Sequence, residues 1–79
     1  MKVRVDVMLK QGVLDPQGKA IGHALGNLGF RGVGDVRVGK TIVLDLAETD
    51  RDKAIENAKN MAEKLLANLV IEDFKVSIV

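Results

Sequence analysis

Few residues of this chain have side chains that could act as a nucleophile, a base or a metal ligand. The sequence holds one histidine, His23, one serine, Ser77, and no cysteine. Without cysteine it has no disulfide, no thiolate nucleophile and no thiolate metal site. Ser77 lacks the Gly-x-Ser-x-Gly surroundings that present a hydrolase nucleophile, and no acidic pair stands in an apolar setting that would divide acid and base roles. We therefore expect no catalytic residue, no cofactor site and no metal site in this chain.

The glycines form a second unusual pattern, because all eight lie between residues 12 and 39. Gly18, Gly22 and Gly26 recur every four residues within a predicted helix, where each costs roughly 0.5–1 kcal/mol relative to alanine. Two interpretations stay open. The stripe lets another backbone approach closely, or an exposed side of the helix simply tolerates glycine.

Hydrophobic periodicity predicts the elements that must position these residues. Alternating apolar and polar residues predict strands over 2–9, 35–38, 41–46 and 74–78. A first helix begins at Asp15-Pro16 and ends before Gly29. A second carries an apolar stripe from 54 to 66 and begins at Thr49, which forms a capping box with Asp52.

The element order is strand, helix, strand, strand, helix, strand, which is a doubled βαβ unit. It predicts an α+β fold, a ferredoxin-like βαββαβ two-layer sandwich whose antiparallel four-stranded sheet carries both helices on one face. A chain of 79 residues fits one domain spanning residues 1–79. The tight reversal between the second and third strands is expected at Val38-Gly39-Lys40.

The second face of this sheet is expected to be polar with apolar spots. Its residues would be Arg4, Asp6, Met8, Arg37, Thr41, Val43, Lys75 and Ser77. A two-layer domain of this size buries only about 60% of its unfolded surface. Association through this face or through a free strand edge is therefore favoured over a stable monomer.

Composition excludes several classes of partner. The net charge of +1 implies no strong attraction to polyanions, and no apolar run approaches the ~18 residues of a membrane span. The two aromatic residues, Phe30 and Phe74, are too few for a base-stacking surface. The charged start of the sequence is unlike a secretory signal. We expect a cytoplasmic protein that binds neither nucleic acid nor membrane.

Three segments together resemble the PurS family, the small subunits of phosphoribosylformylglycinamidine synthase. They are Leu9–Ala20, Asp35–Lys40 and Glu63–Phe74, which occur in the family's order and spacing. The resemblance implies a subunit without catalytic residues, within a glutamine-dependent, ATP-using ligase of the fourth step of purine biosynthesis. It also implies that the chain bridges a synthetase subunit and a glutaminase subunit and supports ammonia transfer between them. ATP and Mg²⁺ are then expected on the synthetase and not on this chain.

Candidate subunit contacts lie in a loop and a turn. The loop supplies Lys10, Gln11, Gly12 and Asp15, and the turn supplies Arg37, Gly39 and Lys40. The chain is further expected to form a homo-oligomer, either a dimer or a tetramer. An alternative function is that of an ACT-like regulatory domain, which would bind a small molecule at a subunit interface near Gly12.

Overall fold

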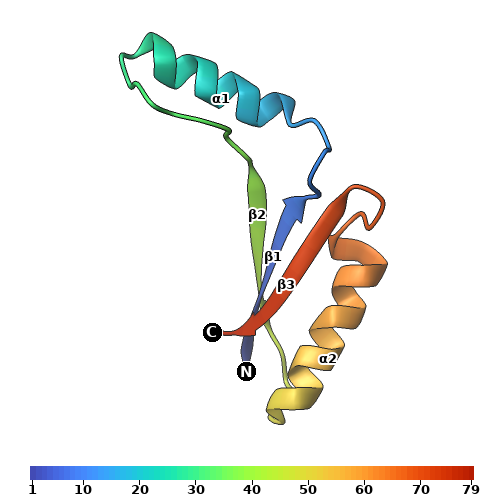
Figure 1. Ribbon diagram of the computed structural model, residues 1–79. Helices are drawn as coiled ribbons and strands as arrows, with labels where there is room; N and C mark the ends of the chain where they lie inside the picture. Colours follow the sequence, from blue (N-terminus) through green and yellow to red (C-terminus); the bar gives the residue numbers. More distant parts are fainter.

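The computed structural model describes all 79 residues and contains two helices and one sheet (Figure 1). The elements in chain order are β1 (Lys2–Leu9), α1 (Pro16–Asn27), β2 (Gly39–Asp45), α2 (Arg51–Met61), the π-helical turn η1 (Ala62–Leu66) and β3 (Glu72–Ile78). The sheet has three strands in the order β2-β1-β3, and both pairings are antiparallel. The α+β class predicted from the sequence is confirmed.

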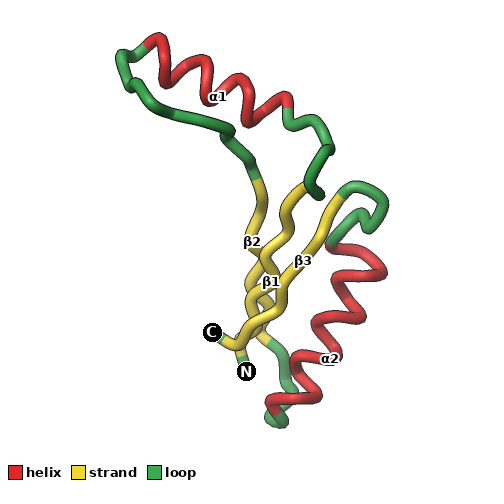
Figure 2. Tube along the Cα trace, in the orientation of Figure 1, coloured by secondary structure: helices red, strands yellow, loops and turns green.

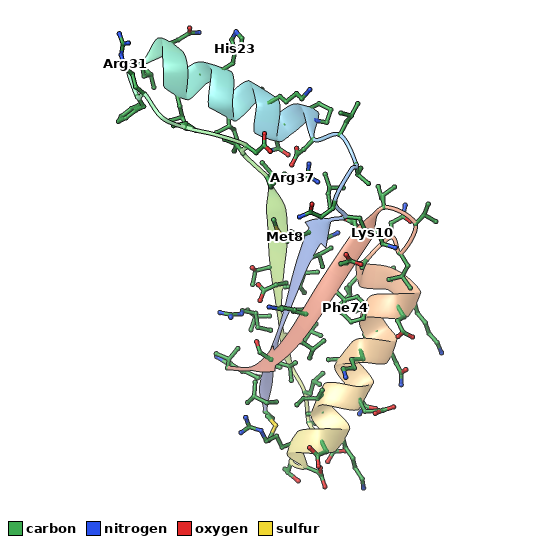
Figure 3. The ribbon with its side chains drawn as sticks, in the orientation of Figure 1. Met8, Lys10, His23, Arg31, Arg37 and Phe74 are labelled. Atoms are coloured by element: carbon green, nitrogen blue, oxygen red, sulfur yellow. The ribbon has the colours of Figure 1, made fainter.

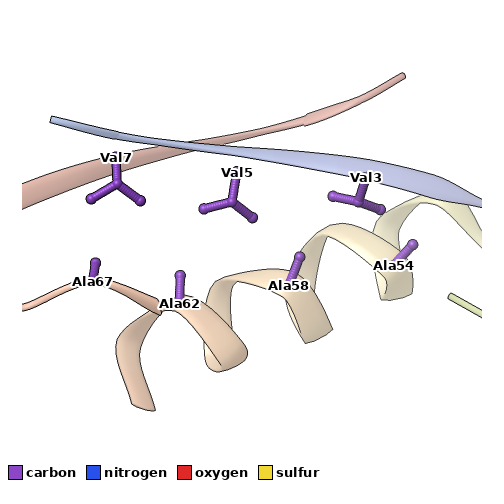
Figure 4. Packing of buried hydrophobic residues seen from close by; sticks show 7 residues of the cluster. All are labelled: Val3, Val5, Val7, Ala54, Ala58, Ala62 and Ala67. Carbon is purple, nitrogen blue, oxygen red and sulfur yellow. The ribbon is translucent and has the colours of Figure 1, made fainter. Parts of the chain in front are cut away.

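The sheet and α2 form the body of the protein, and its core lies between them (Figure 4). Val3, Val5 and Val7 project from one face of the central strand β1 and are at most 1% exposed. Alternation along a strand puts these three on one face. Opposite them lies a row of small side chains: Ala54, Ala58, Ala62 and Ala67. The first three recur every four residues, so they share one helix face and let α2 approach the sheet closely.

Partly buried residues of the outer strands complete this core. They are Ile42, Leu44, Leu46, Leu66, Phe74, Val76 and Ile78. The register pairs Val5 with Ile42 on one side and with Val76 on the other, so the apolar residues of all three strands share the face that α2 covers. This is the face that the sequence pattern predicts.

The segment from Lys10 to Val38, here called the arm, leaves the body (Figures 1 and 2). It consists of the loop after β1, helix α1, and the extended segment Phe30–Val38, here called the strap, which runs back beside α1. None of the main packing contacts between elements involves α1. The molecule is therefore elongated, with extents of 48 × 25 × 15 Å and a radius of gyration of 15.9 Å, against roughly 12 Å for a compact domain of this length.

The predicted ferredoxin-like arrangement is wrong for the single chain in two respects. Residues 35–38 do not form a fourth strand, and α1 does not lie beside α2 on the sheet. The physical reason lies at Val38-Gly39-Lys40, where the predicted reversal is absent. Gly39 lacks the positive φ of a tight hairpin, and it enters β2 directly opposite Met8 of β1. The chain therefore runs straight from the strap into β2.

Helix α2 also departs from the prediction at both ends. Its N-cap is Asp50, whose side chain accepts hydrogen bonds from the Asp52 and Lys53 N–H groups, and not Thr49. Met61 and Leu65 of the predicted apolar stripe are exposed. They lie beside the alanine row and not within it, and the wider π-helical turn brings Leu66 and Ala67 toward the core.

The closeness of the alanine row to β1 predicts a sharp size limit at Ala58. Replacing Ala58 with Leu should lower the free energy of unfolding by about 1–3 kcal/mol, because the larger side chain has no space against the valines. Urea denaturation followed by circular dichroism measures this. The control is Asn57→Leu on the exposed side of α2, and equal stability of the two variants would contradict the packing described.

Candidate functional site

The base of the arm is where the loop after β1 meets the end of the strap. Gly12 turns this loop with a φ of +85°, a conformation that favours glycine. The Arg37 guanidinium crosses from the strap and donates two hydrogen bonds to carbonyl oxygens of the loop, one to Val13 at 2.8 Å and one to Lys10 at 3.0 Å. Figure 3 shows Arg37 at this junction. The Arg37 side chain thus links the strap to a loop that lies more than twenty residues earlier in the sequence.

Asp15 makes the second connection at the arm base. Its side chain is buried, with 5% of the residue exposed. One carboxylate oxygen accepts from the Gly18 N–H at 2.8 Å and caps α1. The other accepts from the Val38 N–H at 2.8 Å and holds the end of the strap. We call Asp15, Arg37 and these four hydrogen bonds the clasp.

The clasp favours the ionised form of Asp15. The pKa of this carboxyl is lowered because the Val38 N–H donates to it, and further because of the Gly18 N–H and the Arg37 charge, although burial opposes the shift. Since the pKa is lower in the folded state than in the unfolded chain, the carboxylate stabilises the fold above the ordinary carboxyl pKa. This stabilisation is lost as the pH falls through the lowered pKa. The clasp is therefore closed near neutral pH.

The glycines at positions 18, 22 and 26 of α1 have different surroundings, so the two interpretations of the stripe apply to different positions. A Cβ at position 18 would overlap the Val36 carbonyl oxygen, and one at position 22 would touch the Val36 side chain at 3.4 Å. At position 26 a Cβ would meet nothing within 4 Å. Gly18 thus confirms close approach of another backbone, which is the strap of the same chain, whereas Gly26 occupies a tolerant site.

A groove of about 450 Å³ lies between α1 and the strap. Its lining includes the charged and titratable residues Asp15, Lys19, His23, Asp35 and Arg37. His23 is exposed, as predicted, and points outward from α1 (Figure 3). Gly12, where the ACT-like alternative places a ligand, lies at one end of the groove.

The predicted contact residues gather at the arm base and at the start of β2, and three of them also have roles within the chain. Asp15 and Arg37 are engaged inside the chain by the clasp, and Gly39 packs against Met8 in the sheet. The remaining four, Lys10, Gln11, Gly12 and Lys40, lie at the arm base or the start of β2. The role of all seven as subunit contacts stays a prediction. Because Arg37 holds the loop, Lys40→Glu is the clean probe of docking.

The strap was not predicted from the sequence as a segment with free backbone groups. None of the backbone hydrogen bonds between elements, turns and loops involves residues 31–37, so its N–H and C=O groups are available to a partner. Gly18 was the sequence signal for the strap. A glycine inside a helix lowers helix stability, and its presence there is explained when another backbone lies close by.

The sheet face opposite α2 carries a small polar network. Asp6 accepts hydrogen bonds from the Arg4 Nε at 3.1 Å and from the Thr41 hydroxyl at 2.7 Å. Met8 and Val43 lie exposed on the same face. Arg37, which was predicted for this face, belongs to the clasp instead. In the whole chain no three acidic or histidine side chains are grouped so as to hold a metal ion, and no helix has both the length and the apolar character to cross a membrane.

Comparison with known proteins gives a consistent family match. Residues 2–79 match the family model described as PurS, phosphoribosylformylglycinamidine (FGAM) synthase. The chain is 49% identical over 77 residues to the phosphoribosylformylglycinamidine synthase subunit PurS of Bacillus subtilis, covering 98% of this chain and 90% of that protein.

Solved structures share the shape as well as the sequence. A Bacillus subtilis PurS crystal structure matches with a TM-score of 0.84 at 50% identity, over 96% of this chain and 94% of that one. A chain in the structure of PurLQS from Thermotoga maritima matches with a TM-score of 0.89 at 33% identity, over 99% of this chain and 95% of that one. Coverage this complete includes the arm together with the body.

The different surroundings of the glycines predict opposite effects of one substitution. Gly26→Ala should raise the free energy of unfolding by roughly 0.5–1 kcal/mol, because alanine favours the helix and the space is open. Gly18→Ala should instead lower it, since the new methyl group displaces the strap. Thermal unfolding of both variants measures the contrast. Equal stabilisation by the two alanines would show that the strap does not lie against α1.

Proposed function

Since the chain belongs to the PurS family of phosphoribosylformylglycinamidine synthase subunits and so to purine biosynthesis, we propose that it acts as a non-catalytic assembly subunit. It bridges the glutaminase and synthetase subunits and supports the passage of ammonia between them. ATP and Mg²⁺ act on the synthetase subunit, and the complex works in the cytoplasm. The observation that carries the proposal is the projecting arm, whose apolar surfaces have no partner within the chain.

The exposed surface supports an assembly role. Only nine of 79 residues are buried, and many large apolar side chains remain exposed. On the arm these are Leu14, Ile21, Leu28, Phe30 and Val33. Single exposed apolar residues are ordinary, but a concentration of them on a projecting segment marks an interaction surface.

Similar structures point to the same kind of partner. The Thermotoga maritima structure is described as PurLQS, and another matching structure names PurS as one of the subunits of formylglycinamide ribonucleotide amidotransferase in Methanocaldococcus jannaschii. By family likeness we propose that this chain associates with the corresponding two subunits. The family match extends over residues 2–79, so the ACT-like alternative receives no support from it.

We further propose that the chain forms a homodimer by exchanging arms. The strap continues directly into β2, and the outer edge of β2 is unpaired because β2 ends the sheet order β2-β1-β3. Two copies related by a twofold axis near Gly39 would each lay a strap beside the partner's β2. This pairing supplies in trans the fourth strand that the sequence pattern predicts, and it is a low-cost route to a closed dimer.

The arm-exchanged dimer predicts a role for the apolar face of α1. Replacing Ile21 and Leu28 together with Gln should raise the dimer dissociation constant at least tenfold, on the order of 1.4 kcal/mol. Both residues are at least 40% exposed, so the free chain loses little packing. Sedimentation equilibrium measures the constant, and circular dichroism checks the fold.

The matched control places two Gln residues on the other side of the same helix, at His23 and Asn27. This variant should dimerise like the unmodified chain. If both double variants associate equally well, the α1 face lies outside the interface and the arm-exchanged dimer is wrong.

Reconstitution tests the assembly role itself. Glutamine-dependent synthesis by the two partner subunits with Mg-ATP should require this chain, whereas synthesis driven by added ammonia should proceed without it, because the synthetase then needs no glutaminase. Product formation is followed with and without the chain. Equal glutamine-dependent rates in both mixtures, with partners active on ammonia, would refute the proposed role. A thermal shift given by amino acids but absent with the partner subunits would favour the sensing alternative.

A further inference from the structure

We propose that Asp15 and Arg37 are positioning residues, whose clasp fixes the direction in which the arm leaves the body and so keeps the chain ready to associate. The proposal rests on the proposed homodimer for its consequence, but its geometric part concerns the single chain. The loop–strap junction was expected to supply contacts to partners. Two of its side chains, Asp15 and Arg37, bind the chain's own backbone.

The arm has few other ties to the body. Two covalent connections, at Leu9–Lys10 and at Val38–Gly39, join it to the sheet. Helix α1 contributes none of the main packing contacts, so no apolar interface holds its angle. Two backbone connections alone would leave the arm free to pivot about the line that joins them.

The clasp restricts this freedom because it joins the loop and the strap to each other, and one further backbone bond ties the loop to the body. The Lys10 N–H donates to the Ile71 carbonyl of the body at 2.8 Å, and the Lys10 carbonyl accepts from Arg37 of the strap. Asp15 then links the strap to the first turn of α1 through Val38 and Gly18. Loop, strap and helix are thereby fixed relative to one another, and the Lys10 bond ties the loop to the body.

The hydrogen bonds of the clasp suit a permanent structural role. The buried carboxylate accepts two backbone N–H bonds, and the exposed guanidinium beside it donates two of its five N–H groups to carbonyl oxygens. Because the arm is ordered before association, binding does not have to include the loss of conformational entropy from ordering it. Loosening the clasp should therefore weaken association even though neither side chain touches the partner.

Asp15→Asn separates the clasp from helix capping. Asparagine caps helices about as well as aspartate, so its oxygen can still accept from the Gly18 N–H. Its NH₂ group, however, then faces the Val38 N–H, and two donors cannot bond. The matched control is Asp50→Asn at the N-cap of α2, where a single carboxylate oxygen accepts both backbone bonds and no strap is involved.

Arg37→Lys provides a second, independent variant. Lysine keeps the positive charge but lacks the planar fork that reaches two carbonyls at once. Arg31→Lys is its control, since Arg31 lies exposed at the arm tip (Figure 3) and takes part in no salt bridge.

Two measurements read the clasp directly. Amide hydrogen exchange should become faster at Val38 but not at Gly18 in Asp15→Asn. Spin labels on cysteines introduced at the exposed positions Asn27 and Glu56 report the angle of the arm, and the chain has no native cysteine to interfere. With labelled chains diluted in unlabelled protein, the distance distribution should broaden in both clasp variants and stay narrow in both controls.

The consequence is measured by sedimentation equilibrium, where the clasp variants should dissociate about tenfold more readily than the controls. Unchanged distance distributions in Asp15→Asn and Arg37→Lys would overturn the proposal, as would broadened distributions with an unchanged dissociation constant. If the unmodified chain stays monomeric, the proposed homodimer fails, and the distance distributions alone decide whether the clasp sets the arm.

Discussion

One buried carboxylate joins the loop, the helix and the strap of the arm. Asp15 ends the loop after β1, caps α1 and holds the strap just before β2 begins. The last two tasks satisfy the N–H groups of Gly18, which is buried, and Val38, which is partly buried, and a buried donor without a partner costs about 1–3 kcal/mol. The course of the chain from Leu9 to Gly39 therefore depends on this single side chain and on Arg37, which fixes the loop beside it.

The body could be predicted from the sequence because its pattern is local. Alternation in β1 identifies the buried valines, and the four-residue spacing of Ala54, Ala58 and Ala62 identifies the face of α2 that meets them. Asp15-Pro16 and Gly29 mark the ends of α1 for equally local reasons: one supplies a cap and the other adopts a φ of +93°.

The arm could not be predicted in the same way. The alternation around Val36 and Val38 correctly indicates an extended backbone, but periodicity carries no information about which edge, or which copy of the chain, pairs with it. Arg37 alternates like a solvent-facing strand residue, yet its guanidinium reaches carbonyls that only the folded loop brings near. Long-range hydrogen bonds of this kind have no signature in the spacing of residues.

The two chain termini lie together at the end of the body remote from the arm (Figure 1). The Val79 N–H donates to the Lys2 carbonyl at 3.1 Å, and the Met1 amino group donates to the Leu46 carbonyl at 2.7 Å. A short peptide could therefore close the polypeptide into a circle without moving the sheet, because nearby surface termini generally tolerate such joining. The arm is then a long insertion in a nearly closed ring of chain. A domain fused at either end would lie far from the arm and would leave the arm accessible (Figure 1).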